Sequence, residues 1–229
     1  MGIVTSVAAM IGLALALAAL PPQTSDRHMA PLEQYLMADR QGEIALARSA
    51  APLSISGNAD VLVLGQRGFD SAAKGTNGFA CLVQRSWSAN IDDVDFWNPK
   101  LRSPICFNPP AARSYMPQTF KRTELVLAGR SKEEMFASLA IAVDRGELPA
   151  IEPNAMGYMM SKQGFLSTRD GHWRPHLMIF TPLIDSAIWG AHLAGSPVIA
   201  FTDKQSRVSV LLIPVGHWSD GTLAPEHRP

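Results

Sequence analysis

The sequence predicts an α+β fold with a mainly antiparallel central sheet, an N-terminal helix and one crossover helix on one face of that sheet. Short apolar runs bounded by Gly, Pro and Asn recur along the chain and are typical of strands. One segment combines a helix-capping pattern with helical apolar spacing. The last third contains consecutive strand-like runs joined by short turns, which favours antiparallel hairpins. This order is also compatible with sensor folds of the profilin or PAS type.

The N-terminal half of the expected domain holds one helix and two strands. Residues 31 to 50 predict a helix, because Pro31 suits a first helical position and apolar residues fall roughly on one face. The runs at 61 to 65 and 78 to 87 predict buried strands. The segment between them, RGFDSAAKGTNG, is rich in turn residues and predicts a loop.

The segment from residue 87 to 117 is expected to be a long irregular loop. Prolines interrupt it repeatedly, and each removes a backbone N–H that a helix interior or a central strand would need. A loop of this length in a compact domain is usually functional or pinned by other contacts. The prolines are Pro99, Pro104, Pro109, Pro110 and Pro117.

The C-terminal half carries the clearest local signals. TELVLAG, at 123 to 129, predicts a strand. Ser131 and Glu134 form a capping box that begins a helix of about 14 residues, and Gly146 ends it. Two hairpins are expected after that helix, the first from strands at 155 to 167 and 176 to 183, the second from strands at 196 to 201 and 207 to 215.

The first 20 residues contain no charged side chain and stand apart from the rest of the chain. An apolar core that ends in Ala16-Leu17-Ala18 is typical of a secretory signal with an A-x-A cleavage site, although no Lys or Arg precedes it. About 20 apolar residues can also span a bilayer, so an uncleaved anchor stays open, as does a buried helix. The predicted organisation is a signal peptide or anchor at 1–20, a linker at 21–30, one α+β domain at 31–223 and a flexible tail at 224–229.

Cysteine content and charge bear on location and partners. Cys81 and Cys106 are an even pair, which in an exported chain favours a disulfide over two buried thiols. We therefore expect a periplasmic or secreted protein. The 20 basic and 20 acidic side chains balance, so the clustered positive charge of a nucleic-acid binder is missing. Membrane contact is expected only through the N-terminal segment, if that segment is uncleaved.

The stretch DGHWRPHLMIF, residues 170 to 180, gathers polar and aromatic side chains at the entrance of a predicted strand. His172 and His176 have the four-residue spacing that brings two imidazoles to one metal ion on a helix. Pro175 lies between them and makes a helix unfavourable. In an extended chain their Cα atoms stand about 13 Å apart, too far for ready ligation of one metal. The expected structure is a turn that enters a buried strand.

A second GHW, at 216 to 218, repeats this motif after the last predicted strand. Loops at one end of a sheet can converge on one pocket, although His and Trp also pack at the edges of cores. The candidates for acid–base chemistry are Asp170, His172, His176, His217 and Asp220. The candidates for ligand binding are Arg102, Trp173, Trp189, His192 and Trp218.

The catalytic motif matches in the sequence lack the surrounding secondary structure that their chemistry requires. Ser71 and Lys74 match the S-x-x-K of serine β-lactamases, but GTNG directly after Lys74 would stop the required helix. The leading interpretation is a non-catalytic ligand-binding or sensor domain, without a cofactor, whose partner is a small molecule or an envelope component. The alternatives are an envelope hydrolase that uses the His and Asp candidates, and an accessory protein that binds a transition metal through His and Met.

Four patterns, KGTNGFACLVQRSW, WNPKLRSPICFNPPAARS, YMMSKQG and GHWRPHLM, resemble a group of exported bacterial proteins of unknown function. The resemblance covers residues 33 to 221. It implies export by a bacterium, and it brings no activity, cofactor or catalytic residue with it.

Overall fold

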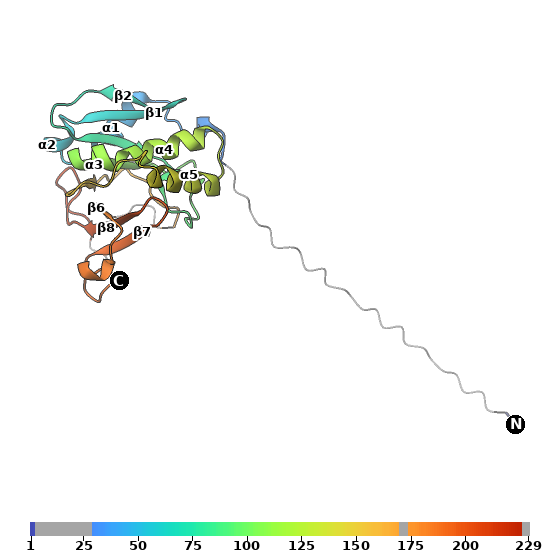
Figure 1. Cartoon of the computed structure of the whole chain (residues 1–229). Coiled ribbons are helices and arrows are strands. Elements are labelled where there is room, and N and C mark those ends of the chain that lie inside the picture. The colour runs from blue at the N-terminus through green and yellow to red at the C-terminus, as the bar shows by residue number, and fades with distance from the viewer. Residues whose placement is uncertain (3–28, 170–173, 226–229) are drawn as a thin grey trace.

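Eight strands form one continuous sheet (Figure 1). The structure is a computed structural model that describes residues 1–2, 29–169 and 174–225. The strands lie in the order β2-β1-β3-β4-β5-β6-β8-β7, and neighbours are antiparallel except β1 and β3. They are β1 (Asp60–Gly65), β2 (Gly68–Ala73), β3 (Ala80–Gln84), β4 (Ser103–Phe107), β5 (Met156–Met159), β6 (His176–Pro182), β7 (Ile199–Asp203) and β8 (Val208–Pro214). The α+β class is confirmed.

Helices cover both faces of this sheet, so the expected placement on one face is wrong. α1 packs over β1, β3 and β4, whereas α3 and α4 lie on the opposite face and α5 packs against α4. Consecutive side chains of β3 point to opposite faces, and all of them are buried, so both faces need cover. The α-helices are α1 (Arg40–Arg48), α2 (Leu53–Ser56), α3 (Pro109–Ser114), α4 (Met116–Leu127) and α5 (Lys132–Asp144); the 3-10 helices are η1 (Leu32–Gln34), η2 (Ser86–Ser88) and η3 (Ser186–Trp189).

The N-terminal helix expected at 31 to 50 is split into η1 and α1. Tyr35, between them, is fully buried against Trp87, and its hydroxyl donates to the carbonyl of Trp97. Its own carbonyl accepts from the Arg85 side chain. These tertiary contacts fix Tyr35 at the end of η1, and α1 begins only after Asp39, whose backbone is extended.

Two further segments differ from expectation. Residues 68 to 73, expected as a loop, form the edge strand β2, which pairs with β1 from Gly65 and Gly68 onward. Residues 123 to 127, expected as a strand, complete α4, where the Thr123 hydroxyl donates to the Thr119 carbonyl one turn earlier. A short apolar run does not distinguish a buried strand from a buried helix, which explains the second error.

The expected proline-rich loop at 87 to 117 contains β4 and α3 and the start of α4. Pro104 lies inside β4, opposite Val83 of β3. The N–H of Arg102 bonds to Phe165, on the side away from β3. Since strand N–H groups alternate in direction, the nitrogen of Pro104 points the same way, where β5 does not reach. The prolines at the starts of α3 and α4 occupy first-turn positions, where no N–H is needed.

Several local signals are confirmed. The Ser131 side chain accepts from the Glu134 N–H, Glu134 accepts from the Ser131 N–H, and Gly146 follows the end of α5 with a φ of 68°. The pairs β5–β6 and β7–β8 are antiparallel as predicted. The predicted signal or anchor, most of the linker and the end of the tail lie outside the described residues. No helix within the described ranges is long and apolar enough to cross a membrane.

Cys81 and Cys106 form a disulfide between paired positions of β3 and β4. The prediction of this bond is confirmed. Both cysteines are fully buried beneath α1, among Ala47, Val61 and Val83. Because disulfides persist in oxidising surroundings, the bond indicates an oxidising, extracellular-type compartment.

Candidate functional site

A cavity of about 420 Å³ lies between the sheet and the chain segment that follows β3. The sheet contributes an apolar wall from β5, β6, β7 and β8. This wall consists of Met159, Met178, Phe201, Val210 and Leu212. Residues of η2 and of the segment from 89 to 95 form much of the remaining wall, together with Tyr115 at the start of α4. The size and the mainly apolar floor are those of a small-molecule site.

Hydroxyl groups without partners gather in the wall of this cavity. The hydroxyl oxygens of Ser86 and Ser88 are shielded from solvent and have no hydrogen-bond partner among the described residues. The hydroxyl of Tyr115, a half-buried residue of the wall, has no hydrogen-bond partner among the described residues, and burial raises the pKa of its phenol. Its ring stacks on Phe180 with centroids 3.8 Å apart, which holds the ring in place. Because the two serine oxygens are shielded from solvent, a molecule in the cavity does not reach them, and the Tyr115 hydroxyl is the group of these three that a ligand or water can bond.

His176, at the first position of β6, lines the same cavity. Its Nδ1 lies 2.7 Å from the carbonyl oxygen of Arg174, and a carbonyl only accepts, so Nδ1 carries the hydrogen. Burial lowers the pKa of this imidazole, against the smaller opposing effect of that hydrogen bond. His176 is therefore a neutral imidazole at pH 7, with Nε2 as its acceptor.

The pH dependence of stability should depend on His176. Because its pKa is lowered by folding from 6.5, the unfolded chain binds the proton more readily, and stability is lost as pH falls below about 6.5. We expect the unfolding free energy of the wild type to fall relative to that of His176→Asn between about pH 7.5 and 5. For one titrating group, the unfolding free energy can change by at most about 1.4 kcal/mol per pH unit. Urea denaturation at several pH values measures it, and parallel curves for the two proteins would contradict the assignment.

The buried charged groups of the cavity wall have protein partners. The fully buried Arg85 side chain pairs with Glu43 of α1 at 2.8 Å and also donates to the Tyr35 carbonyl. The Asp95 carboxylate accepts from the N–H of Thr168 at 2.7 Å and from the Asn98 amide at 3.1 Å. These pairs shape the wall and leave its interior without an uncompensated charge.

Arg102, a predicted ligand-binding residue, stabilises the loop instead. Its guanidinium donates to the carbonyls of Pro99, Leu101 and Gln34, which joins the loop before β4 to η1. Burial lowers the pKa of Arg102 to about 10, and the positive charge of Arg85 contributes in the same direction. Arg102 does not belong to the cavity wall.

Trp189 and His192 lie on the connection between β6 and β7, outside the cavity wall. Trp189 is exposed on η3. His192 has a φ of 61°, and its Nε2 lies within hydrogen-bond distance of the N–H and the carbonyl of Ala200 on the edge strand β7. This imidazole therefore stabilises the edge of the sheet.

His217, Trp218 and Asp220 share a turn after β8, and none of them lines the cavity. Asp220 accepts from Lys162 at 2.7 Å and from the Thr222 hydroxyl, and chiefly the bond from Lys162 lowers the pKa of its carboxyl. Trp218 is buried and closes the turn, because its N–H donates to the Thr222 carbonyl and its carbonyl accepts from the Gly221 N–H. The turn packs on the end of β5, because the Ser219 N–H bonds to the Met160 carbonyl.

Asp170, His172 and Trp173 lie outside the described residues. The two GHW motifs lie next to the start of β6 and the end of β8, and the strand register shows where these two strand ends lie. His176 pairs with Pro214, so the start of β6 and the end of β8 lie at the same end of the sheet. Of the predicted site residues that the structure describes, His176 is the one that lines the cavity.

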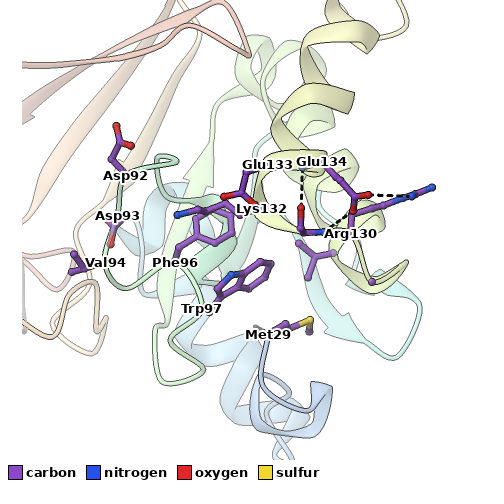
Figure 2. Close-up of a pocket in the computed structure, with 13 residues that line it drawn as sticks. Met29, Asp92, Asp93, Val94, Phe96, Trp97, Arg130, Lys132, Glu133 and Glu134 are labelled. Atoms are coloured by element: carbon purple, nitrogen blue, oxygen red, sulfur yellow. Dashed lines mark hydrogen bonds and ion pairs between the residues drawn. The ribbon is translucent and has the colours of Figure 1, made fainter. Parts of the chain in front are cut away.

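A second hollow, of about 810 Å³, opens beside the first and shares with it the segment 92 to 94 (Figure 2). Figure 2 shows Phe96 and Trp97 on one side and Lys132 reaching toward the Phe96 ring. Its charged groups have neighbours of their own: Arg130 pairs with Glu134, which also caps α5. We therefore place the candidate site in the smaller cavity, where hydroxyls are without partners.

Sequence reasoning missed Ser86, Ser88 and Tyr115. The signal was weak: RSWS follows a buried strand directly, and polar residues at a strand end often face a site. Tyr115 could not be found from the sequence, because its place depends on how α4 crosses the sheet.

Within residues 29–169 and 174–225, no group of three or more His, Cys, Asp or Glu side chains is placed to hold a metal ion. Comparisons with protein-family models, with curated proteins and with solved structures find no match to this chain.

Proposed function

We propose that this protein is an exported, non-catalytic binding domain of the sensor or carrier type, which takes a small molecule into the 420 Å³ cavity. The observation that carries the proposal is the cavity itself, in which an apolar wall from β5, β6, β7 and β8 lies with Tyr115, whose hydroxyl has no hydrogen-bond partner among the described residues. A bound molecule would pack on the apolar wall and give the Tyr115 hydroxyl a hydrogen-bond partner.

Export from a bacterium, into the periplasm or the medium, belongs to this proposal. The disulfide, the uncharged N-terminal segment and the resemblance to exported bacterial proteins support it. A binding role is preferred to a hydrolase because His176 is the one described acid–base candidate that lines the cavity. The other acid–base candidates that are described, His217 and Asp220, lie on a turn outside the cavity wall.

The proposal predicts that protein purified without denaturant retains a small molecule, and that Tyr115→Phe lowers its occupancy. Loss of one neutral hydrogen bond costs about 1 kcal/mol, or roughly five-fold in affinity. Native mass spectrometry measures the retained mass and its fraction in each variant.

Tyr158→Phe is the matched control, because Tyr158 lies on β5 beneath α1, on the other face of the sheet. It loses the same hydroxyl and should keep wild-type occupancy. Equal losses in both variants would place the molecule elsewhere, and protein that retains nothing and binds no probe would exclude the function.

A further inference from the structure

Gln84, the last residue of β3, places a buried side-chain amide in the wall of the cavity. It lines the cavity and is 8% exposed. Its Nε2 donates to the Thr119 hydroxyl on α4 at 3.2 Å, which orients the amide. Its Oε1 has no hydrogen-bond partner among the described residues, and it is accessible, unlike the shielded hydroxyl oxygens of Ser86 and Ser88. An amide oxygen only accepts hydrogen bonds, so Gln84 presents an acceptor to a molecule in the cavity.

Two hydroxyl groups of the wall neighbour this amide. Thr119, the partner of Gln84, lies one helical turn after Tyr115, so these two side chains lie on the same face of α4. Ser103 pairs with Gln84 across β3 and β4, and opposite side chains of an antiparallel pair point to the same face. Ser103 and Tyr115 both line the cavity. Their hydroxyls can donate as well as accept, so Gln84 is the member of this set that requires a donor from its partner.

The strand order separates this polar part of the wall from the apolar part. Gln84 and Ser103 lie on β3 and β4, whereas the apolar Met178 and Val210 lie on β6 and β8, beyond β5. A molecule that packs on the apolar part and has no donor covers the Gln84 oxygen without bonding to it, which opposes binding. A molecule of the same shape with a donor next to Gln84 avoids that penalty.

We infer that Gln84 determines the specificity of this cavity. It selects a molecule that carries an N–H or O–H group beside its apolar part, and that group donates to the Gln84 Oε1. Molecules of the same shape that carry only acceptors, such as ketones, are disfavoured because they leave this oxygen without a partner. This inference rests on the proposed function and specifies one chemical property of its ligand.

Two probes of equal shape, cyclohexanecarboxamide and cyclohexyl methyl ketone, test the inference. Both have a ring and a carbonyl, but the ketone has a methyl group where the amide has its N–H donors. Their affinities for the disulfide-bonded protein are measured by ligand-observed NMR at neutral pH. Gln84→Met removes the acceptor and keeps the length of the side chain. We expect it to weaken amide binding by about five-fold, the effect of one neutral hydrogen bond, and to leave ketone binding unchanged.

Gln118→Met is the matched control, because Gln118 is a buried glutamine of α4 that lies outside the cavity wall. It should leave the affinities of both probes unchanged. Thr119→Val is a second test variant, which keeps the Gln84 oxygen but removes the hydroxyl that orients the amide. It should weaken amide binding more than ketone binding, and it takes the place of Gln84→Met if circular dichroism shows that this variant does not fold.

The outcomes separate the inference from the proposed function. If the folded Gln84 variant changes the affinities of both probes equally, or changes neither, the inference is overturned. The binding function still stands in that case, because both probes bind the wild type. A retained natural molecule without an N–H or O–H group likewise overturns the inference alone. If neither probe binds and the purified protein retains nothing, the binding function fails, and the inference fails with it.

Discussion

Replacing Arg85 by methionine is expected to lower the free energy of unfolding by about 3 to 5 kcal/mol. Arg85 and Glu43 are both buried, and their ion pair joins β3 to α1. Without the guanidinium, Glu43 stays buried with no opposing charge, and the Tyr35 carbonyl loses its donor. Urea denaturation followed by far-UV circular dichroism measures the loss.

Arg113→Met is the matched control for this ion pair. Arg113 pairs with Glu152 at 2.6 Å, but the two side chains are 60% and 37% exposed, so water replaces the lost partner. We expect this variant to lose less than about 1 kcal/mol. The double variant Arg85→Met/Glu43→Gln should lose less free energy of unfolding than the two single variants lose in sum. We expect the difference to be about 1 to 3 kcal/mol. Equal losses at the buried and exposed pairs would contradict the prediction.

Reduction of the Cys81–Cys106 disulfide is expected to lower the free energy of unfolding by about 3 to 4 kcal/mol. The bond closes a loop with a sequence separation of 25 residues, and opening it restores chain entropy to the unfolded state. Denaturation with and without a reductant measures the difference, with thiol titration to verify that the bond has opened.

The double variant Cys81→Ala/Cys106→Ala controls for other effects of the reductant. Its stability should be low and should not change when reductant is added, because no bond remains to be opened. A wild type that loses no stability after verified reduction would show that the packing of β3 against β4 suffices without the bond.

Signals confined to a few neighbouring residues predicted their elements well. The capping box of Ser131 and Glu134 specifies the start of α5 through two hydrogen bonds between residues three apart. The hairpin of β7 and β8 also depends on a short turn between two apolar runs. Such elements depend little on the rest of the molecule, so the sequence contains nearly all the information that they require.

Elements that depend on distant partners were predicted poorly. β2 contains Gly68, Ser71 and two alanines, which favour strands weakly, and it forms because β1 offers an edge. α4 looked like a strand because its apolar run is short, and burial against Trp87 and Phe136 decided in favour of a helix. Pro104 is tolerated in β4 because its nitrogen faces the side that β5 leaves open.

For the fold class and the candidate site too, some features follow from the sequence and others from tertiary packing. Composition and pattern were enough to predict the α+β class, the Cys81–Cys106 bond and His176 as a candidate site residue, because these depend on residue type and local spacing. Packing decided that helices cover both faces of the sheet and that η2, Tyr115 and His176 line one cavity. Segments far apart in the chain meet there, and which side chains they leave without partners depends on how the sheet, η2 and α4 pack together.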